Sequence, residues 1–436
     1  MKNKILLVMA ALLLLALPLG SGCAPKEVEV EVEKEYVEIP MGFICDVSGP
    51  YASTTASYLH SLIDFIKWVN ETDYIPGVKL RLDWHDDRGS VELATTAYER
   101  MIAEKPRAPV LINWESHVQL ALKDRLIEDE FPAIASGPPP VIHPPGWIFS
   151  IMAEYAHEHA SLLWWIKNVD WKQGVNPNWE DRPPRLGIIT WDTAYGRAFM
   201  SDAFFKYAEE QGFEYVGVEY IPVMPTDTST QILSLMKKEP DYIDGNYMAF
   251  AWAVLLKDAQ RLGYLDKARW TMAEVGLDHY LPDLAGDACE GAIGVYPNRT
   301  WGVNDFLTEP CPAIELAEKL FKDNVRPPED RRHGYLHGLL WGLRCVETLK
   351  VAIDEYGAEA MIGPDNGKLY YDTLVSAKNV DLMGITTPQN YGDKRWSGSC
   401  YINTIRDGKV VPLYLDWIAP PVLEGDAEEG YDGTNP

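Results

Sequence analysis

Three residue pairs in this 436-residue chain have a spacing that could serve metal binding or catalysis. They are two histidine pairs and one serine–lysine pair. His333 and His337 are four residues apart, a helical spacing that can present two imidazoles to one metal ion. His157 and His159 would lie on different faces of a helix, which makes them a poor metal pair. The segment Ser-Leu-Met-Lys at 234–237 has the spacing of a lysine-activated serine, but it reads as a helix interior and the partner motifs are missing. No third metal ligand accompanies the histidines, so we predict no metal site and no catalytic residue.

Several classes of function lack support in the sequence. It has no phosphate-binding GxxxxGK[ST] loop, no GxGxxG after a strand, no HExxH and no GxSxG, so we expect neither an enzyme nor a bound cofactor. Asp and Glu number 65 against 39 Lys and Arg, a formal net charge of −26. Such an acidic surface repels phosphate backbones and anionic lipid headgroups, which excludes nucleic-acid binding and a polybasic membrane dock.

The amino terminus has the pattern of an export signal. After two lysines, residues 5–17 are apolar, a stretch too short to span a bilayer, and small residues then lead to Cys23. We therefore predict a lipoprotein signal peptide over residues 1–22 and a lipid anchor on Cys23, with ordinary signal cleavage as the alternative. The Glu-rich stretch over residues 23–38 is predicted to be an extended acidic tether rather than a strand.

Five cysteines follow Cys23. An exported protein can form disulfides, and Cys289 and Cys311 bracket a loop-like stretch, so they are the expected pair. Because five is an odd number, at least one thiol should stay free. The spacing is far from any CxxC pattern, which argues against structural zinc.

Hydrophobic periodicity places these residues on alternating strands and helices. Apolar strand-like runs over residues 39–47 and 78–84 flank a helical pattern over 54–70. A proline-rich break over residues 137–146 separates this set from a second one of similar size. Repeated strand–helix units are typical of α/β folds whose parallel sheets are covered on both faces.

Several segments together resemble the solute-binding proteins of ABC transporters, in the branched-chain amino-acid (leucine/isoleucine/valine-type) family. The segments that carry the resemblance are 41–51, 80–87, 192–197, 288–294, 383–386 and 407–412. Their order and spacing follow the family over about residues 38–415. The resemblance implies the type I periplasmic-binding-protein fold: two Rossmann-like parallel-sheet lobes joined by three crossovers, with a ligand held in the cleft. The expected parts are lobe 1 (39–152 plus 283–358), lobe 2 (153–282 plus 359–417) and an acidic tail (418–436).

The candidate ligand contacts follow predicted strands, at the sheet edge where ligands bind in such folds. In the first lobe, Ser116 is expected as a helix N-cap beside N–H groups that could hold a ligand carboxylate, and the family has small hydroxyl residues there. A plain cap is the alternative for Ser116, and the core is the alternative for Trp114 as a pocket wall. In the second lobe, the resemblance puts Tyr195 at the family's cleft tyrosine and Glu274 at the acid that pairs with a ligand ammonium. The remaining candidates are Tyr51, Ser136, Asn246 and Tyr247.

The chain departs from the family at residues 137–140, where Gly-Pro-Pro-Pro replaces the usual small or hydroxyl residues. Because proline has no N–H to donate, standard recognition of an amino-acid carboxylate is in doubt. We expect a small polar solute: an amino acid, an amide or an aromatic amino-acid-like compound. The resemblance implies a monomeric, extracytoplasmic, membrane-anchored protein that works with an ABC permease and its ATPase. A ligand-sensing receptor of the same fold is the alternative, and a periplasmic enzyme is less favoured.

Overall fold

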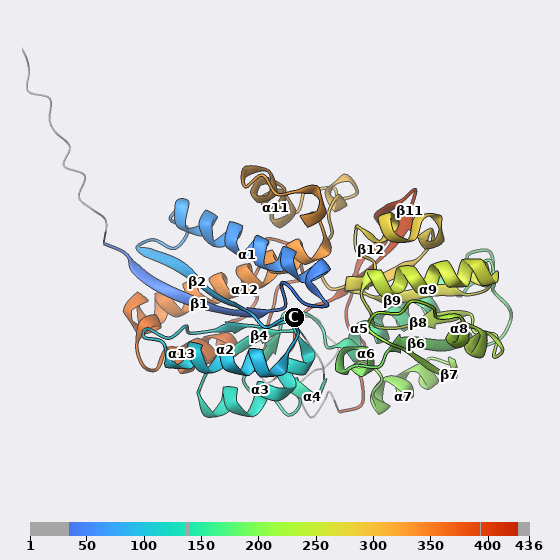
Figure 1. The fold of residues 1–436 in the computed structure, drawn as a ribbon, viewed down its shortest axis with the longest axis horizontal. Coiled ribbons are helices and arrows are strands. Elements are labelled where there is room, and N and C mark those ends of the chain that lie inside the picture. The colour runs from blue at the N-terminus through green and yellow to red at the C-terminus, as the bar shows by residue number, and fades with distance from the viewer. Residues whose placement is uncertain (1–34, 137–138, 393, 426–436) are drawn as a thin grey trace, which may run out of the picture. The chain divides into compact units, whose positions relative to one another are not determined.

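The computed structural model describes residues 35–136, 139–392 and 394–425, and those from Tyr36 onward form one compact unit (Figure 1). The predicted signal peptide, Cys23, most of the tether and most of the acidic tail lie outside the described residues. None of the helices in the described part of the chain combines the length and apolarity needed to cross a bilayer.

The first lobe is built on a five-stranded parallel sheet with the order β2–β1–β3–β4–β5. Its strands are β1 (Val37–Cys45), β2 (Val78–Asp86), β3 (Leu111–Ile112), β4 (Ala133–Ala135) and β5 (Ile148–Ser150). Its helices are α1 (Ala52–Glu71), α2 (Val91–Ala103), α3 (Ser116–Glu128), α4 (Pro139–Ile142), α11 (Pro312–Asp323), α12 (His333–Tyr356) and α13 (Asn366–Ser376). The apolar residues of β1 are almost fully buried, as expected for a central parallel strand covered on both faces.

The second lobe is built on a seven-stranded sheet with the order β12–β11–β10–β9–β8–β6–β7. Its strands are β6 (Arg185–Trp191), β7 (Glu214–Ile221), β8 (Tyr242–Asp244), β9 (Arg269–Ala273), β10 (Ile293–Tyr296), β11 (Cys400–Arg406) and β12 (Lys409–Ile418). Its helices are α5 (Tyr155–Trp165), α6 (Ala194–Arg197), α7 (Asp202–Glu210), α8 (Ser229–Met236), α9 (Ala249–Leu262) and α10 (Leu281–Ala285). Strands β6 to β10 pair in parallel, whereas β11 and β12 are antiparallel additions at one edge.

The chain passes between the lobes three times, at residues 151–154, 297–311 and 377–399, as the two-lobed architecture requires. Two of the expected boundaries are wrong. Strand β10 pairs with β9, so the first lobe does not begin again at residue 283. Helix α13 packs against α12 and is part of the first lobe, so the second does not resume at residue 359.

The three crossings are tied to one another by hydrogen bonds. The Gln389 side-chain N–H donates to the Ile151 carbonyl, which joins the first crossing to the third. Arg299 N–H donates to the Ile385 carbonyl (2.7 Å), which joins the second crossing to the third. The segments that would carry a hinge motion are therefore coupled, and we expect them to move together.

Helices α1 and α12 touch because glycine recurs every fourth residue along α12, at Gly334, Gly338 and Gly342. A Cβ atom on Gly338 would lie 2.5 Å from the Tyr58 carbonyl oxygen of α1, closer than any side chain allows. The close approach brings side chains of two helices that are far apart in sequence to the same end of the first sheet.

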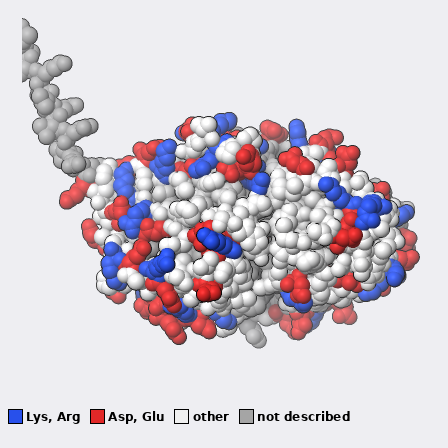
Figure 2. Space-filling model, in the orientation of Figure 1, with Lys and Arg blue, Asp and Glu red and all other residues white. Residues whose placement is uncertain are grey.

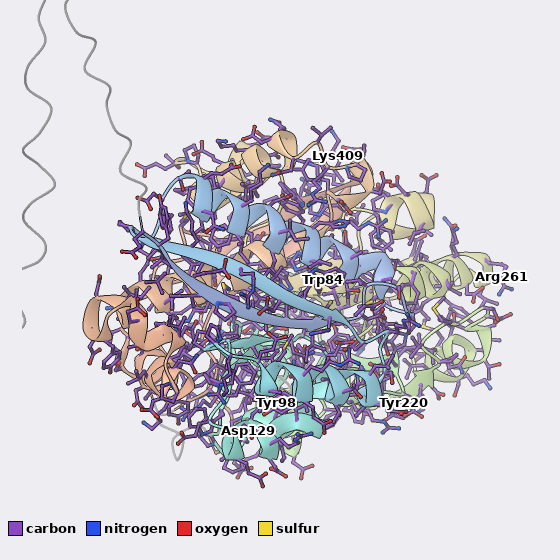
Figure 3. The ribbon with its side chains drawn as sticks, turned by 60° about the vertical axis from the view of Figure 1, so that its left-hand side comes forward. Trp84, Tyr98, Asp129, Tyr220, Arg261 and Lys409 are labelled. Atoms are coloured by element: carbon purple, nitrogen blue, oxygen red, sulfur yellow. The ribbon has the colours of Figure 1, made fainter. Side chains whose placement is uncertain are left out.

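Elsewhere in this lobe the Tyr98 hydroxyl of α2 donates to Asp129, directly after α3 (2.6 Å; Figure 3).

The expected disulfide between Cys289 and Cys311 is wrong. Neither residue forms a disulfide, and both thiols are buried, as are those of Cys45, Cys345 and Cys400. The physical reason is their placement in different hydrophobic cores: Cys289 packs in the core of the second lobe, and Cys311 packs with the first-lobe helices.

Charged side chains are spread over the surface of both lobes, with Lys and Arg interspersed among the more numerous Asp and Glu (Figure 2). The visible face shows no block of positive charge among the described residues.

Candidate functional site

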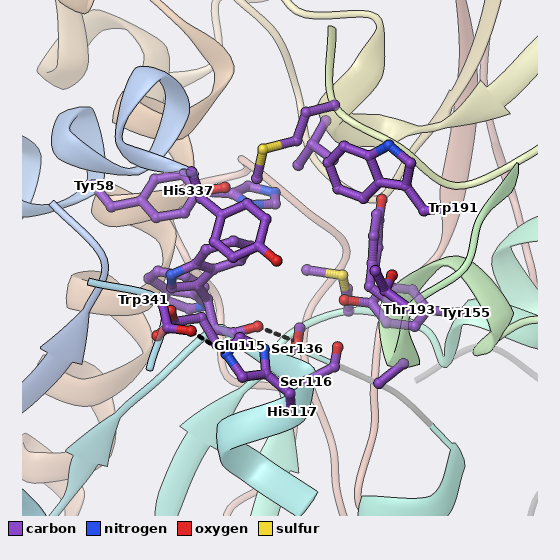
Figure 4. Close-up of a pocket in the computed structure, with 18 residues that line it drawn as sticks. Tyr58, Glu115, Ser116, His117, Ser136, Tyr155, Trp191, Thr193, His337 and Trp341 are labelled. Carbon is purple, nitrogen blue, oxygen red and sulfur yellow. Dashed lines mark hydrogen bonds between the residues drawn. The ribbon is translucent and has the colours of Figure 1, made fainter. Parts of the chain in front are cut away.

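A cavity of about 210 Å³ lies between the two lobes, at the carboxyl ends of strands from both sheets (Figure 4). Seven aromatic side chains make up much of its wall. Four come from the first lobe and three from the second: Tyr51, Tyr58, Trp114 and Trp341, then Tyr155, Trp191 and Tyr195. A site formed by both lobes at the carboxyl ends of parallel strands is the arrangement expected of ligand-binding α/β folds.

The seven rings form an unbroken series around the cavity. Their successive centroid distances are 5.0 Å (Trp341–Tyr58), 5.8 Å (Tyr58–Trp114), 5.8 Å (Trp114–Tyr51), 6.3 Å (Tyr51–Trp191), 6.3 Å (Trp191–Tyr195) and 5.3 Å (Tyr195–Tyr155). Most of these contacts are edge-to-face or tilted, the geometries that aromatic pairs prefer. In Figure 4, Tyr58 and Trp341 lie on one side of the open space and Trp191 and Tyr155 on the other. We call these seven side chains the aromatic wall.

Five of the eight predicted ligand contacts line this cavity: Tyr51, Trp114, Ser116, Ser136 and Tyr195. Tyr51 is held by the loop after β1, where its N–H donates to the buried carboxylate of Asp46 (2.9 Å). The carboxylate thereby sets the position of the tyrosine at the rim of the first lobe.

The loops after β3 and β4 are tied together beneath the cavity. The Ser136 hydroxyl donates to the Trp114 carbonyl (2.7 Å), and the buried Gln119 amide donates to the Ser136 oxygen (3.0 Å). Ser116 is not the cap we expected, because the N-cap of α3 is Glu115 and Ser116 is the first helical residue. The Ser116 side chain nevertheless lines the cavity.

In the second lobe, the turn after β6 presents Trp191, Thr193 and Tyr195 to the cavity. The Thr193 hydroxyl caps the short helix α6 by accepting the Gly196 N–H (3.0 Å). Gly196 is needed there because a Cβ atom would lie 2.1 Å from the Trp191 carbonyl oxygen. The tight turn therefore sets both aromatic side chains.

Asn246 and Tyr247 are buried beside the cavity but are not among the residues that line it. The Asn246 amide donates to the Tyr195 carbonyl (3.2 Å), and its oxygen lies 2.8 Å from His159 Nε2. The other nitrogen of His159, Nδ1, lies 2.6 Å from Asp244 Oδ2, and both residues are fully buried. Asn246 thus supports the turn that carries Tyr195. The Tyr247 side chain packs in the second-lobe core, where burial raises the pKa of its hydroxyl well above the usual value.

Glu274 begins the short turn directly after β9, and its side chain lies outside the described residues. The next residue, Val275, lines the cavity. The role of Glu274 toward a ligand ammonium stays a prediction.

Glu115 is a wall residue that the sequence reasoning passed over among 65 acids. Its carboxyl group is buried, and the buried Asp87 and Asp46 lie behind it, after β2 and β1. Burial, a hydrogen bond with Asp87 and the charges of Asp87 and Asp46 raise the pKa of Glu115 well above its usual value. Burial likewise raises the pKa of Asp87. The first-lobe side of the cavity is therefore acidic.

The histidine pair considered for metal binding lies in the first two turns of α12. His333 Nε2 and His337 Nε2 are 2.9 Å apart, and His337 Nε2 is also 2.8 Å from the Asn298 side-chain oxygen. Only His337 of this pair lines the cavity. Within the described residues, no group of three or more His, Cys, Asp or Glu side chains could hold a metal ion.

The chain is similar to known proteins in both sequence and structure. Residues 38–309 match a family described as periplasmic binding protein. A search of curated protein sequences gives no match. Among solved structures, the chain is similar to a branched-chain amino acid ABC transporter protein from Thermus thermophilus with bound valine (21% identity, TM-score 0.73), covering 87% of this chain and 96% of that one.

Two further structures share the fold. One is an ABC transporter substrate binding protein from Aeropyrum pernix (17% identity, TM-score 0.74), covering 89% of this chain and 97% of that one. The other is a fatty acid ABC transporter substrate-binding protein from Thermomonospora curvata (19% identity, TM-score 0.70), covering 87% and 92%. At these identities the likeness establishes the two-lobed architecture.

Proposed function

This chain belongs to the periplasmic binding protein family, and from that premise we propose that it captures a small organic solute for an ABC importer. The solute occupies the cavity between the lobes, and the lobes close over it by moving about the three crossings. The loaded protein then docks on a membrane permease powered by a cytoplasmic ATPase. Valine and fatty acids, named for two of the structural relatives, are starting points for the ligand search.

The observation that carries the proposal is that both lobes supply the wall of one cavity. Tyr51 and Trp114 of the first lobe face Trp191 and Tyr195 of the second, so a bound solute would touch both lobes at once. Such contacts stabilise the closed arrangement by the differential affinity of the ligand for it. A cavity that one lobe could form alone would give no such coupling.

The proposal includes export and anchoring outside the cytoplasmic membrane. The sequence of residues 1–23 supports a lipoprotein signal with its lipid on Cys23. Two acyl chains would make such an anchor stable, whereas a single chain holds only marginally. Mass spectrometry of the membrane-extracted protein tests this, because an unmodified amino-terminal cysteine would exclude the anchor.

Ligand capture is tested by thermal unfolding of the mature protein against a panel of amino acids, amides, aromatic acids and fatty acids. A specific ligand stabilises the native state by mass action, by roughly 2.7 kcal/mol at one hundred times its Kd. The variant Trp114→Ala should lose this stabilisation. The matched control is Trp84→Ala on β2, a residue that is 43% exposed and does not line the cavity (Figure 3).

Two outcomes would count against the proposal: no compound that stabilises the protein, or stabilisation that Trp114→Ala leaves intact. Recovery of the ligand by mass spectrometry after long incubation separates capture from catalysis, since an enzyme would return a changed compound. Uptake by vesicles that contain the permease and ATPase separates an importer from a ligand-sensing receptor of the same fold.

A further inference from the structure

The charge of the cavity wall restricts what the cavity can hold. Among the described residues that line it, none is a lysine or an arginine. The acidic wall residue is Glu115, which is 1% exposed, with Asp87 and Asp46 buried at its back. Apart from the contact between the two carboxyl groups, Glu115 Oε1 and Asp87 Oδ2 have no hydrogen-bond partner among the described residues. The first-lobe wall thus offers buried carboxyl oxygens and no side-chain counter-ion of its own.

The aromatic wall adds a second, independent feature. Its seven members come from both lobes, and they present π-electron density around the space next to Glu115. The face of an aromatic ring attracts a cation through its quadrupole, most strongly where water is excluded. The indole nitrogens of three wall members, Trp191, Trp341 and Trp114, are buried, have no hydrogen-bond partner among the described residues and carry no charge.

We propose, on the basis of the proposed function, that the solute carries an alkylated ammonium group. This group is bound within the aromatic wall, with Glu115 as its counter-ion. Methyl or other alkyl groups on the nitrogen pack against the ring faces. The positive charge favours the ionised form of the buried Glu115 carboxyl group, which then balances it. Each ring contributes without needing a hydrogen bond, so the site suits a cation that has no N–H to donate.

The polar groups of the wall make the competing classes less suitable. A ligand carboxylate finds no lysine or arginine in the described wall and lies near three acids. The wall histidines are directed at protein oxygens: His117 Nε2 lies 3.2 Å from the Gly89 carbonyl, and His337 Nε2 lies 2.8 Å from Asn298.

The test compares a cation with its neutral copy. Isothermal titration of the full mature protein uses choline and tetramethylammonium, and 3,3-dimethylbutan-1-ol, in which carbon replaces the charged nitrogen of choline. We expect choline to bind at least about tenfold more tightly than the neutral alcohol, because desolvated cation–π contacts and the carboxylate act only on the charge. The same titrations include valine, benzoate and a fatty acid.

Two variants assign the contact. Glu115→Gln should weaken choline at least about tenfold and leave the neutral alcohol unchanged, while the matched control Glu99→Gln, an exposed glutamate on α2, should change neither. Trp191→Leu, from the opposite lobe, is the second test and still applies if Glu115→Gln fails to fold. It should weaken the binding of choline more than the binding of the neutral alcohol.

Equal binding of choline and its neutral copy would overturn the inference, and so would binding of valine, benzoate or the fatty acid without binding of either cation. In those cases a ligand still binds and the proposed function stands. Failure of every compound, in the titrations and in the wider panel above, would count against the proposed function as well.

Discussion

Tyr51 of the first lobe and Trp191 of the second lie with their ring centroids 6.3 Å apart, so an aromatic contact joins the two lobes within the wall of the cavity. Tyr51 follows β1 and Trp191 ends β6, which places both at the carboxyl ends of central strands. The residues that a ligand would touch are therefore the ones through which the lobes meet. Ligand binding and lobe closure are expected to depend on the same side chains.

Removing this contact should shift the ligand-free protein toward an open form. Aromatic pairs contribute about 0.5–1.5 kcal/mol beyond their buried area, so Trp191→Leu should weaken closure by that amount. Small-angle X-ray scattering should then give a larger radius of gyration than for the unaltered protein. The control is Trp164→Leu, because Trp164 on α5 contacts Tyr414 at 6.4 Å within the second lobe alone. Equal radii for the two variants would contradict the role of the contact in closure.

The sequence predicted the parts of the site that lie at strand ends. Tyr51, Trp114, Ser136 and Tyr195 each follow a strand whose apolar run is visible in the chain, and each lines the cavity. Parallel strands bring their carboxyl ends to one edge, so a local pattern is enough to place these residues. Trp191 had the same signal, as the last residue of β6, but it was not among the predicted contacts.

Tyr58 and Trp341 could not be placed in the same way. They lie within helices α1 and α12, at positions whose periodicity is that of core residues, and nearly 300 residues separate them in the chain. Only the close packing of these helices at Gly338 brings the two rings 5.0 Å apart. The boundary errors have the same origin, because the sheet that β10 joins depends on pairing between distant strands.

Glu115→Gln should make the ligand-free protein more stable at neutral pH. Burial first, then the hydrogen bond with Asp87 and the charges of Asp87 and Asp46, raise the folded-state pKa of Glu115 above its ordinary 4.5. The folded state therefore binds this proton more tightly than the unfolded state, and the free energy of unfolding falls as the pH rises above about 4.5. The variant carries no such proton and should lose less stability over this range. Urea unfolding at several pH values measures the effect, with the exposed Glu99→Gln as control. A steeper decline in Glu115→Gln than in the control would contradict the assignment.

Glu154, at the first crossing, should act in the opposite direction. Its burial would raise its pKa, but hydrogen bonds and charge from His143 and His157 outweigh burial and lower the pKa to about 2. His143 Nε2 lies 2.6 Å and His157 Nδ1 3.5 Å from the same carboxylate oxygen. Since the folded-state pKa is depressed, the stabilisation is complete above about pH 4.5 and is lost as the pH falls toward 2.

The change to measure is therefore the acid side of the stability profile. Glu154→Gln should flatten the loss of unfolding free energy between pH 4.5 and 2 by about 3 kcal/mol, because folding lowers the pKa of this carboxyl from 4.5 to about 2. Circular dichroism during urea unfolding gives the free energies. Glu239→Gln is the control, because its side chain is 82% exposed beside Arg185. An unchanged acid limb in Glu154→Gln would show that another carboxylate causes it.

The turn after β6 offers a way to disturb the second-lobe wall without altering any side chain that lines it. In Gly196→Ala the added Cβ would meet the Trp191 carbonyl oxygen at 2.1 Å, so the backbone that carries Trp191 and Tyr195 must shift. The shift also strains the Thr190 hydroxyl, which donates to the Gly196 carbonyl (2.8 Å). We expect a loss of about 1–3 kcal/mol in unfolding free energy, typical of overpacking.

The same substitution should weaken binding of whichever panel compound stabilises the protein, because two residues of the aromatic wall, Trp191 and Tyr195, move together. Gly146→Ala is the matched control: its Cβ would meet its nearest neighbour, Ile127 Cδ1, at 3.7 Å, an ordinary van der Waals distance. That variant should stay within about 0.5 kcal/mol of the unaltered protein and keep its affinity. If Gly196→Ala lowers stability while affinity is unchanged, the turn supports the fold but does not set the geometry of the site, since binding should follow the positions of Trp191 and Tyr195 rather than global stability.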